Sequence, residues 1–198
     1  MTERRAWVER ITAETAVGVT VTLRPGSCTV ATGVGFLDHM LATLARHAGL
    51  GLEVEARGDL HVDAHHTVED VGLTLGQALD QLLGDRSGLA RFGHAYAPMD
   101  EALARAVVDL SGRPFCRISL PDHLITAWVT REFPLTLVGE FWRAVASRGK
   151  LTLHLDLERG VDPHHAAEAL FKAAALALRQ ALAFIGADVA SAKGTLTA

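Results

Sequence analysis

Cysteine is scarce in this chain of 198 residues: Cys28 and Cys116 are its only two thiols, and they lie far apart. Such a pair supplies neither a disulfide framework nor the closely spaced thiolates of a zinc site. Long apolar runs are also missing, since no stretch approaches the ~20 consecutive apolar residues of a membrane helix. We therefore predict a protein that folds around an ordinary hydrophobic core and has no membrane partner.

Concentrated positive charge is absent as well. The formal net charge is -4 and no run of Lys and Arg occurs, which argues against a nucleic-acid surface but allows a small basic pocket. The first residues, MTERRAWVERIT, are charged and contain no continuous apolar segment, so they do not resemble a secretory signal. We expect a cytoplasmic protein without a nucleic-acid partner.

Histidine, in contrast, is abundant, with ten residues. Four of them belong to two copies of the motif Asp-x-His-His-x-x-Glu, spelled VDAHHTVED at residues 62–70 and VDPHHAAEA at residues 161–169. The copies are 99 positions apart, which is half the length of the chain. This spacing indicates internal duplication within a single domain of residues 1–198, with halves at approximately residues 1–90 and 91–198.

Hydrophobic periodicity predicts the same elements before each motif. Residues 36–58 and 136–160 each read as an amphipathic helix, a turn and an alternating strand, whereas residues 7–25, 91–110 and 113–121 read as further strands. Asp63 and Asp162 occupy expected N-cap positions and Pro163 suits the first helical position, so each motif is predicted to open a helix. The predicted fold class is α+β, with two similar halves that each form a β-sheet covered by helices on one face.

The motif has the residue types and the spacing of a metal site. Its first His and its Glu are four positions apart and share one helix face, so each pair can hold one ion. These pairs are His65 with Glu69 and His164 with Glu168. The adjacent His66 and His165 point about 100° away around the helix and suit a second ion or a neighbouring chain. Imidazole combined with carboxylate favours Mn, Fe, Co, Ni or Zn over Mg or Ca.

A helix cap explains a single copy of the motif about as well as a ligand does, but two copies in register favour metal. The preceding helices carry two more ligand types, His39 and Glu140, at an offset of 101. We predict two pseudo-equivalent sets of metal ligands. His66 and His165 would then complete the coordination shells crosswise, each serving the ion of the other set. The sets are His39, His65, Glu69 and Glu140, His164, Glu168.

The ordered set of motifs along the whole chain resembles the imidazoleglycerol-phosphate dehydratase family. The matching segments are TGVGFLDHML, GDLHVDAHHTVEDVGLTLGQAL, RFG, PMDEAL, DLSGRP, LHL, PHHAAEALFKAAALALRQAL and SAKG. The resemblance implies loss of water from imidazole glycerol phosphate to give imidazole acetol phosphate, in histidine biosynthesis. It also implies two Mn ions per site, which stabilise the anion of the substrate ring, and a homo-oligomer of 24 subunits with shared active sites.

The resemblance assigns roles to residues of this chain. It implies metal ligands at His39, His65, His66, Glu69, His164, His165 and Glu168, and at the position of Glu140, where GEFW replaces the EHFF of many relatives. It implies a phosphate-binding set of Arg91, Arg113, Ser191 and Lys193. Ala192 stands where relatives usually carry a second hydroxyl, which predicts slightly weaker phosphate binding. The carboxylate that moves the proton is either Glu168 or Glu14, and Glu14 also counts among the substrate-binding residues.

Two other functions compete with this interpretation. A two-metal phosphatase or peptidase would use the same ligands and arginines, and a metal-buffering protein would use the ligands without turnover. The paired carboxylates Asp100 and Glu101 also suggest acid–base chemistry. Because consecutive strand residues face opposite ways, we expect at most one of the two to point into a given site.

Overall fold

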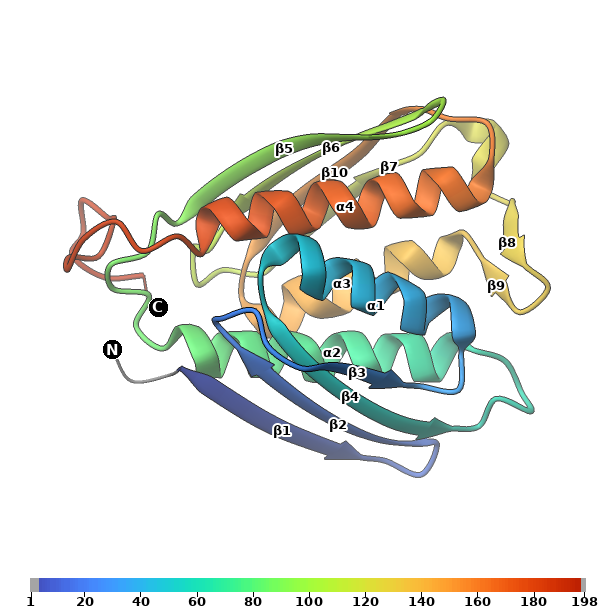
Figure 1. Ribbon diagram of the computed structural model, residues 1–198, viewed down its shortest axis with the longest axis horizontal. Coiled ribbons are helices and arrows are strands. Elements are labelled where there is room, and N and C mark those ends of the chain that lie inside the picture. Colours follow the sequence, from blue (N-terminus) through green and yellow to red (C-terminus); the bar gives the residue numbers. More distant parts are fainter. Residues whose placement is uncertain (1–3, 197–198) are drawn as a thin grey trace.

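The computed structural model describes residues 4–196, which form two four-stranded sheets with the long helices lying between them (Figure 1). The first half contains β1 (Arg5–Ile11), β2 (Thr15–Thr22), β3 (Cys28–Ala31), α1 (Gly35–Ala48), β4 (Gly51–Gly58) and α2 (His65–Leu83). The second half contains β5 (Phe92–Met99), β6 (Ala102–Asp109), β7 (Phe115–Ser119), a 3-10 turn η1 (Asp122–Leu124), β8 (Trp128–Thr130), β9 (Phe133–Pro134), α3 (Thr136–Gly149), β10 (Thr152–Arg159) and α4 (Pro163–Ala181).

The two halves share one topology. Their strand orders are β1-β2-β4-β3 and β5-β6-β10-β7, and in each sheet only the last pair, β3 with β4 or β7 with β10, runs parallel. The predicted duplication and α+β class are therefore confirmed. The second half differs by an insertion, η1 with the β8–β9 hairpin, between its third strand and its first helix. Sequence periodicity did not identify β3, β8 or β9, because strands of two to four residues are too short to show alternation.

Each sheet buries one face against the helices. On β2 the side chains of Val17, Val19 and Val21 are fully buried, whereas Gly18 and Thr20 between them lie with Trp7 and Glu9 on the other face of the sheet. This two-residue period is the one that the sequence shows, and it places the helices on a single face of the sheet. No helix in the described range combines the length and the apolar character that a bilayer-spanning segment needs.

The helices of the two halves interleave. Between the sheets, α1 of the first half packs against α4 of the second, and α2 packs against α3. Gly72 and Gly76 allow the second contact, because a Cβ atom at either position would lie less than 3 Å from backbone atoms of α3. Each half thus buries its apolar helix faces against the other half, and ligands on α1 meet the motif of α4.

Gly93 is expected to be essential for the approach of α4 to its sheet. A Cβ atom at this β5 position would overlap the carbonyl oxygen of Ala177 on α4, a contact that only backbone movement relieves. Gly93→Ala should lower the free energy of unfolding by about 1–3 kcal/mol, measured by urea denaturation. Gly18→Ala in β2 is the control, because a Cβ atom at Gly18 would meet no atom within 4 Å. Equal losses in the two variants would contradict the packing argument.

Candidate active site

The two His-His motifs open α2 and α4, as predicted. Asp162 caps α4: its Oδ1 atom accepts the backbone N–H groups of His164 (2.7 Å) and His165 (3.3 Å), and Pro163 occupies the first turn. The N-cap prediction for Asp63 was wrong by one residue, because α2 begins at His65 and Ala64 holds the N-cap position. The Asp63 carboxylate still accepts the backbone N–H of His65 at 2.7 Å. It therefore stabilises the first turn of α2 from the position before the N-cap.

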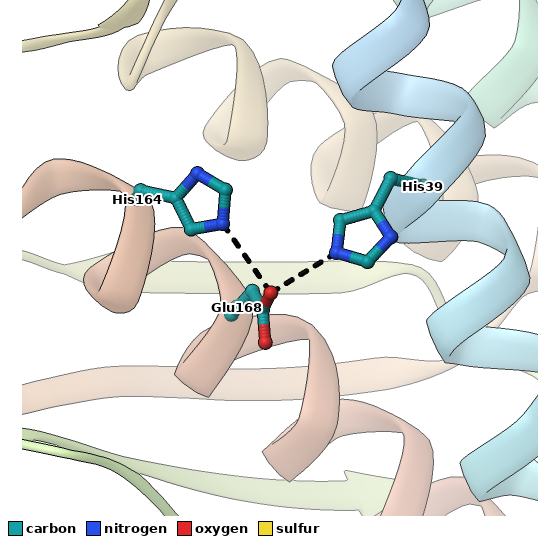
Figure 2. Close-up of side chains that lie close together, drawn as sticks. All are labelled: His39, His164 and Glu168. Atoms are coloured by element: carbon teal, nitrogen blue, oxygen red, sulfur yellow. Dashed lines mark hydrogen bonds and ion pairs between the residues drawn. The ribbon is translucent and has the colours of Figure 1, made fainter.

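One compact group of metal-ligand types forms in the part of the chain that the structure describes. It consists of His39 from α1 with His164 and Glu168 from α4, and its three ligand atoms lie within 4.8 Å of one another. Both histidine Nε2 atoms approach the same oxygen of Glu168, at 3.0 Å for His39 and 3.3 Å for His164 (Figure 2). The imidazoles are about half exposed, whereas the Glu168 side chain is 10% exposed. The group is open to solvent on its imidazole side.

The composition of this group corrects the predicted grouping of ligands. His39 was expected to join His65 and Glu69 in its own half, but it joins the motif of the other half. The physical reason is the interleaving of the helices, which places α1 against α4. Sequence offsets identify equivalent positions, but they do not show which equivalent positions meet.

Glu168 is held as an ionised carboxylate. Its second oxygen accepts from Lys172 Nζ at 2.5 Å, one helical turn further along α4. Burial acts to raise its pKa, but the hydrogen bonds from Lys172 and His39 outweigh burial and lower the pKa to about 2. Both oxygens of Glu168 are therefore in contact with neighbouring side chains, and the group presents a fixed negative charge to the two imidazoles.

The first-half set is not assembled in the same way. His65 Nε2 and Glu69 Oε2 lie 3.9 Å apart on one face of α2, as predicted, and both side chains are about half exposed. Glu140 is the fifth residue of α3 as His39 is of α1, but its carboxylate pairs with Arg143 at 2.6 Å. Within residues 4–196, Glu140 does not join His65 and Glu69 in a metal-sized cluster. The neighbouring guanidinium attracts the carboxylate along its own helix.

The second histidine of each motif points away from the first, as the helix geometry predicts. His65 and His164 face the glutamates of their own helices, Glu69 and Glu168, whereas His66 and His165 face residues outside these helices. Each diverging ring contacts acidic groups: His66 contacts Asp59 and Glu14, and His165 contacts Glu101 and Asp100. Hydrogen bonds to Asp59 and Glu101 raise the pKa of His66 and His165 respectively.

Asp100 and Glu101 both face the His165 ring, which corrects the expectation that only one of them could. Glu101 Oε2 is 2.7 Å from Nδ1 and Asp100 Oδ2 is 3.7 Å from Nε2. The two residues form the turn between β5 and β6, where Asp100 has a φ of 47°, so strand alternation does not apply. Glu101 also accepts the backbone N–H groups of Asp162 and Val161, and these bonds together with that to His165 lower its pKa to about 2.

Sequence reasoning missed two residues of this region, Asp59 and Lys172, and did not place Glu101 against His165. For Lys172 a signal was available, because it lies four residues after Glu168 and so on the same helix face. Asp59 and Glu101 lie in turns that only the tertiary structure brings to the motif helices. No periodicity in the sequence identifies such contacts.

The predicted phosphate-binding residues gather at the opposite end of the molecule from the His39 cluster. Arg91 donates its backbone N–H to Ala181 at the end of α4, and its guanidinium binds Asp109 at 2.7 and 3.1 Å and the Ala190 carbonyl at 2.7 Å. The Ala190 carbonyl directly precedes Ser191, and Lys193 follows with its N–H on the Ser191 hydroxyl. Arg91 thereby ties the segment that carries Ser191 and Lys193 to β5.

Arg113 lies near the same end. It follows Ser111, whose hydroxyl accepts the Arg113 N–H at 3.2 Å, and its side chain is exposed. The helix α4 runs from the cluster at His164 to Ala181 (Figure 1), and 17 residues at about 1.5 Å per residue separate these ends by about 25 Å. One chain therefore does not place its metal-ligand cluster beside its own phosphate-binding candidates.

Comparisons with known proteins agree with the family that the sequence motifs resemble. The sequence profile of the imidazoleglycerol-phosphate dehydratase (IGPD) family matches residues 32–178. A curated imidazoleglycerol-phosphate dehydratase of Salinibacter ruber is 54% identical over 98% of this chain and 96% of the relative. The crystal structure of the Staphylococcus aureus enzyme superposes with a TM-score of 0.80 at 39% identity, covering 90% of this chain and 98% of that one. The structure of the Pyrococcus furiosus IGPD gives 0.82 at 34% identity, covering 94% and 99%.

Proposed function

This chain belongs to the imidazoleglycerol-phosphate dehydratase family, hydro-lyases of histidine biosynthesis, and from that premise we propose that its reaction depends on two Mn ions per active site. The observation that supports a metal is the convergence of His39, His164 and Glu168 on one point. Two ligands at about 2.1 Å from a shared ion lie at most about 4.2 Å apart, so ligand atoms within 4.8 Å need only small movements to bind one.

The donor set fits the proposed ion. Two neutral imidazoles and one ionised carboxylate suit Mn²⁺ and the neighbouring transition metals, and the exposed imidazole side leaves coordination positions for substrate. The His65–Glu69 pair, with His66 and His165, is our candidate for the second ion, and Glu140 joins it only after leaving Arg143. When bound, such ions act as Lewis acids toward the substrate ring.

We assign the proton transfer to Glu14 rather than to Glu168. Glu168 Oε1 faces the two imidazoles of the cluster and Oε2 bonds Lys172, an arrangement that suits a metal ligand. The Glu14 side chain is 56% exposed and lies 3.8 Å from His66, so its carboxylate is accessible beside the motif.

We further propose that each active site is shared between subunits of a homo-oligomer. An imidazole ring joined to glycerol phosphate is far shorter than the ~25 Å between the two ends of α4. Phosphate binding by Arg113, Ser191 and Lys193 therefore requires these residues to come from a different copy than His164. A closed assembly, 24 subunits by the family resemblance, would satisfy this requirement at every site.

One assay separates the candidate functions. Metal-stripped protein is supplied with imidazole glycerol phosphate and Mn²⁺, and both imidazole acetol phosphate and inorganic phosphate are measured. We expect the acetol phosphate to form only when metal is present. Release of inorganic phosphate would indicate a phosphatase, and equal rates without metal would refute the Mn dependence.

Removing the charge of Lys193 is expected to weaken substrate binding selectively. A lost charge-assisted hydrogen bond to phosphate is worth about 1.5–3 kcal/mol, so Lys193→Ala should raise the substrate Kd by about 10- to 100-fold. Binding of an imidazole ligand without phosphate should not change, and calorimetry can compare the two ligands. Arg57→Ala is the control, because Arg57 is an 86% exposed cation on β4. Equal losses for both ligands would exclude a phosphate contact.

A further inference from the structure

The second histidine of each motif has a carboxylate fixed on its Nδ1 atom. In the second half Glu101 Oε2 lies 2.7 Å from His165 Nδ1, and in the first half Asp59 Oδ2 lies 3.0 Å from His66 Nδ1. Each of these Nδ1 contacts is the shortest that its ring makes with a carboxylate among the described residues. The duplicated rings thus make the same hydrogen bond from the same nitrogen.

The two carboxylates come from positions that are not equivalent in the duplication. Asp59 directly follows β4, and its counterpart after β10 is Val161, whose apolar side chain has no acceptor. Arg57 and Arg159 pair with the second residues of β2 and β6 respectively, so Gly160 is the counterpart of Gly58. Glu101 directly precedes β6, and the equivalent position before β2 is Glu14, which stays 3.8 Å from His66. The hydrogen bond is present in both halves although its acceptor comes from different turns. Because Asp59 in the turn after β4 accepts the hydrogen bond from His66, Glu14 is not hydrogen-bonded to that ring.

This contact decides which nitrogen of each ring is available. An ionised carboxylate has no proton and can only accept, so the ring must carry its N–H on Nδ1. A neutral imidazole has one N–H, and its lone pair is then on Nε2. Carboxylates that hold the non-ligating nitrogen in this way fix the tautomer and orientation of metal-binding histidines in many proteins.

We infer that Glu101 and Asp59 are positioning residues that fix the tautomer and direction of His165 and His66, so that Nε2 of each ring is the atom offered to a metal ion. This inference rests on the proposed metal function. It assigns different tasks to Glu14 and Glu101, although both occupy the same place in the fold. Glu101 is held by the ring and by two backbone N–H groups, and Glu14 is exposed.

Glu101→Gln separates the positioning role from a structural one. Oε1 of Glu101 accepts the N–H groups of Val161 (3.1 Å) and Asp162 (2.8 Å), and the glutamine oxygen can keep both bonds. Its NH₂ group then faces His165 Nδ1 as a donor, which forces the ring proton onto Nε2 and blocks that atom as a ligand. We expect Mn²⁺ affinity to fall by about 10- to 100-fold. The thermal midpoint of the metal-free protein should stay close to that of the wild type.

Affinity is measured on metal-stripped full-length protein by titration with Mn²⁺ alone, with electron paramagnetic resonance detecting the free ion. Asp59→Ala, which removes the acceptor from His66, should also weaken binding, whereas Glu9→Gln, an exposed β1 carboxylate, should not. Wild-type affinity in both Glu101→Gln and Asp59→Ala, together with weakened binding in His165→Ala, would overturn the positioning role and leave the metal function intact. Wild-type affinity in His165→Ala as well would instead refute its assignment as a ligand.

Discussion

His164→Ala is expected to lower kcat/KM for imidazole glycerol phosphate by at least about a hundredfold. Changes to groups that only support a metal ligand already cost about 10- to 100-fold, so loss of a ligand itself should cost more. The substitution removes one of the two imidazoles that converge on Glu168, and nothing else in the described cluster replaces it. Steady-state kinetics with Mn²⁺ and metal analysis of the purified protein should show the loss together.

The fold should tolerate this change, because the His164 side chain is 45% exposed. His94→Ala on the exposed side of β5 is the control and should leave both activity and metal content unchanged. His65→Ala extends the test to the first half, where His65 and Glu69 are 3.9 Å apart without a third ligand from the same chain. Wild-type turnover in either motif variant would mean that its histidine serves the fold and not the reaction.

Mixed oligomers of two variants that are each impaired are expected to recover activity. If His164 and Lys193 of one site come from different subunits, a site in a mixed particle can receive an intact copy of each. Random mixing of His164→Ala and Lys193→Ala subunits should leave both residues intact in about a quarter of the sites. Co-expression of two differently tagged chains, followed by purification on both tags, yields the particles for kinetics at low substrate concentration.

The comparison for this experiment is the mean of the two homogeneous variants. Activity well above that mean indicates shared sites, whereas activity equal to the mean indicates sites contained in one chain. The ~25 Å separation along α4 favours the first result. The matched control for assembly is a mixed particle of two kinds of chain. One chain is wild type, and the other carries both His164→Ala and Lys193→Ala.

The sequence by itself determined the features that depend on local geometry. Periodicity defined most strands and all four long helices, the 99-residue offset identified the two halves, and the Asp-Pro pair at Asp162 and Pro163 marked the start of α4. Four-residue spacing predicted that His65 and Glu69, and likewise His164 and Glu168, share a helix face, and one-residue spacing predicted that His66 and His165 face other partners. These predictions succeed because the periods of a helix and a strand relate residues that lie only a few positions apart in the sequence.

Only the tertiary structure decided which groups meet. His39 joins Glu168 and not Glu69, because apolar helix faces from the two halves are buried against each other and bring α1 to α4. Asp59 and Glu101 reach the diverging histidines from turns whose side-chain directions follow no period. The cluster and the phosphate-binding candidates are separated because α4 is a straight helix with one at each end. Such pairings depend on how distant segments pack, and local residue spacing carries no information about them.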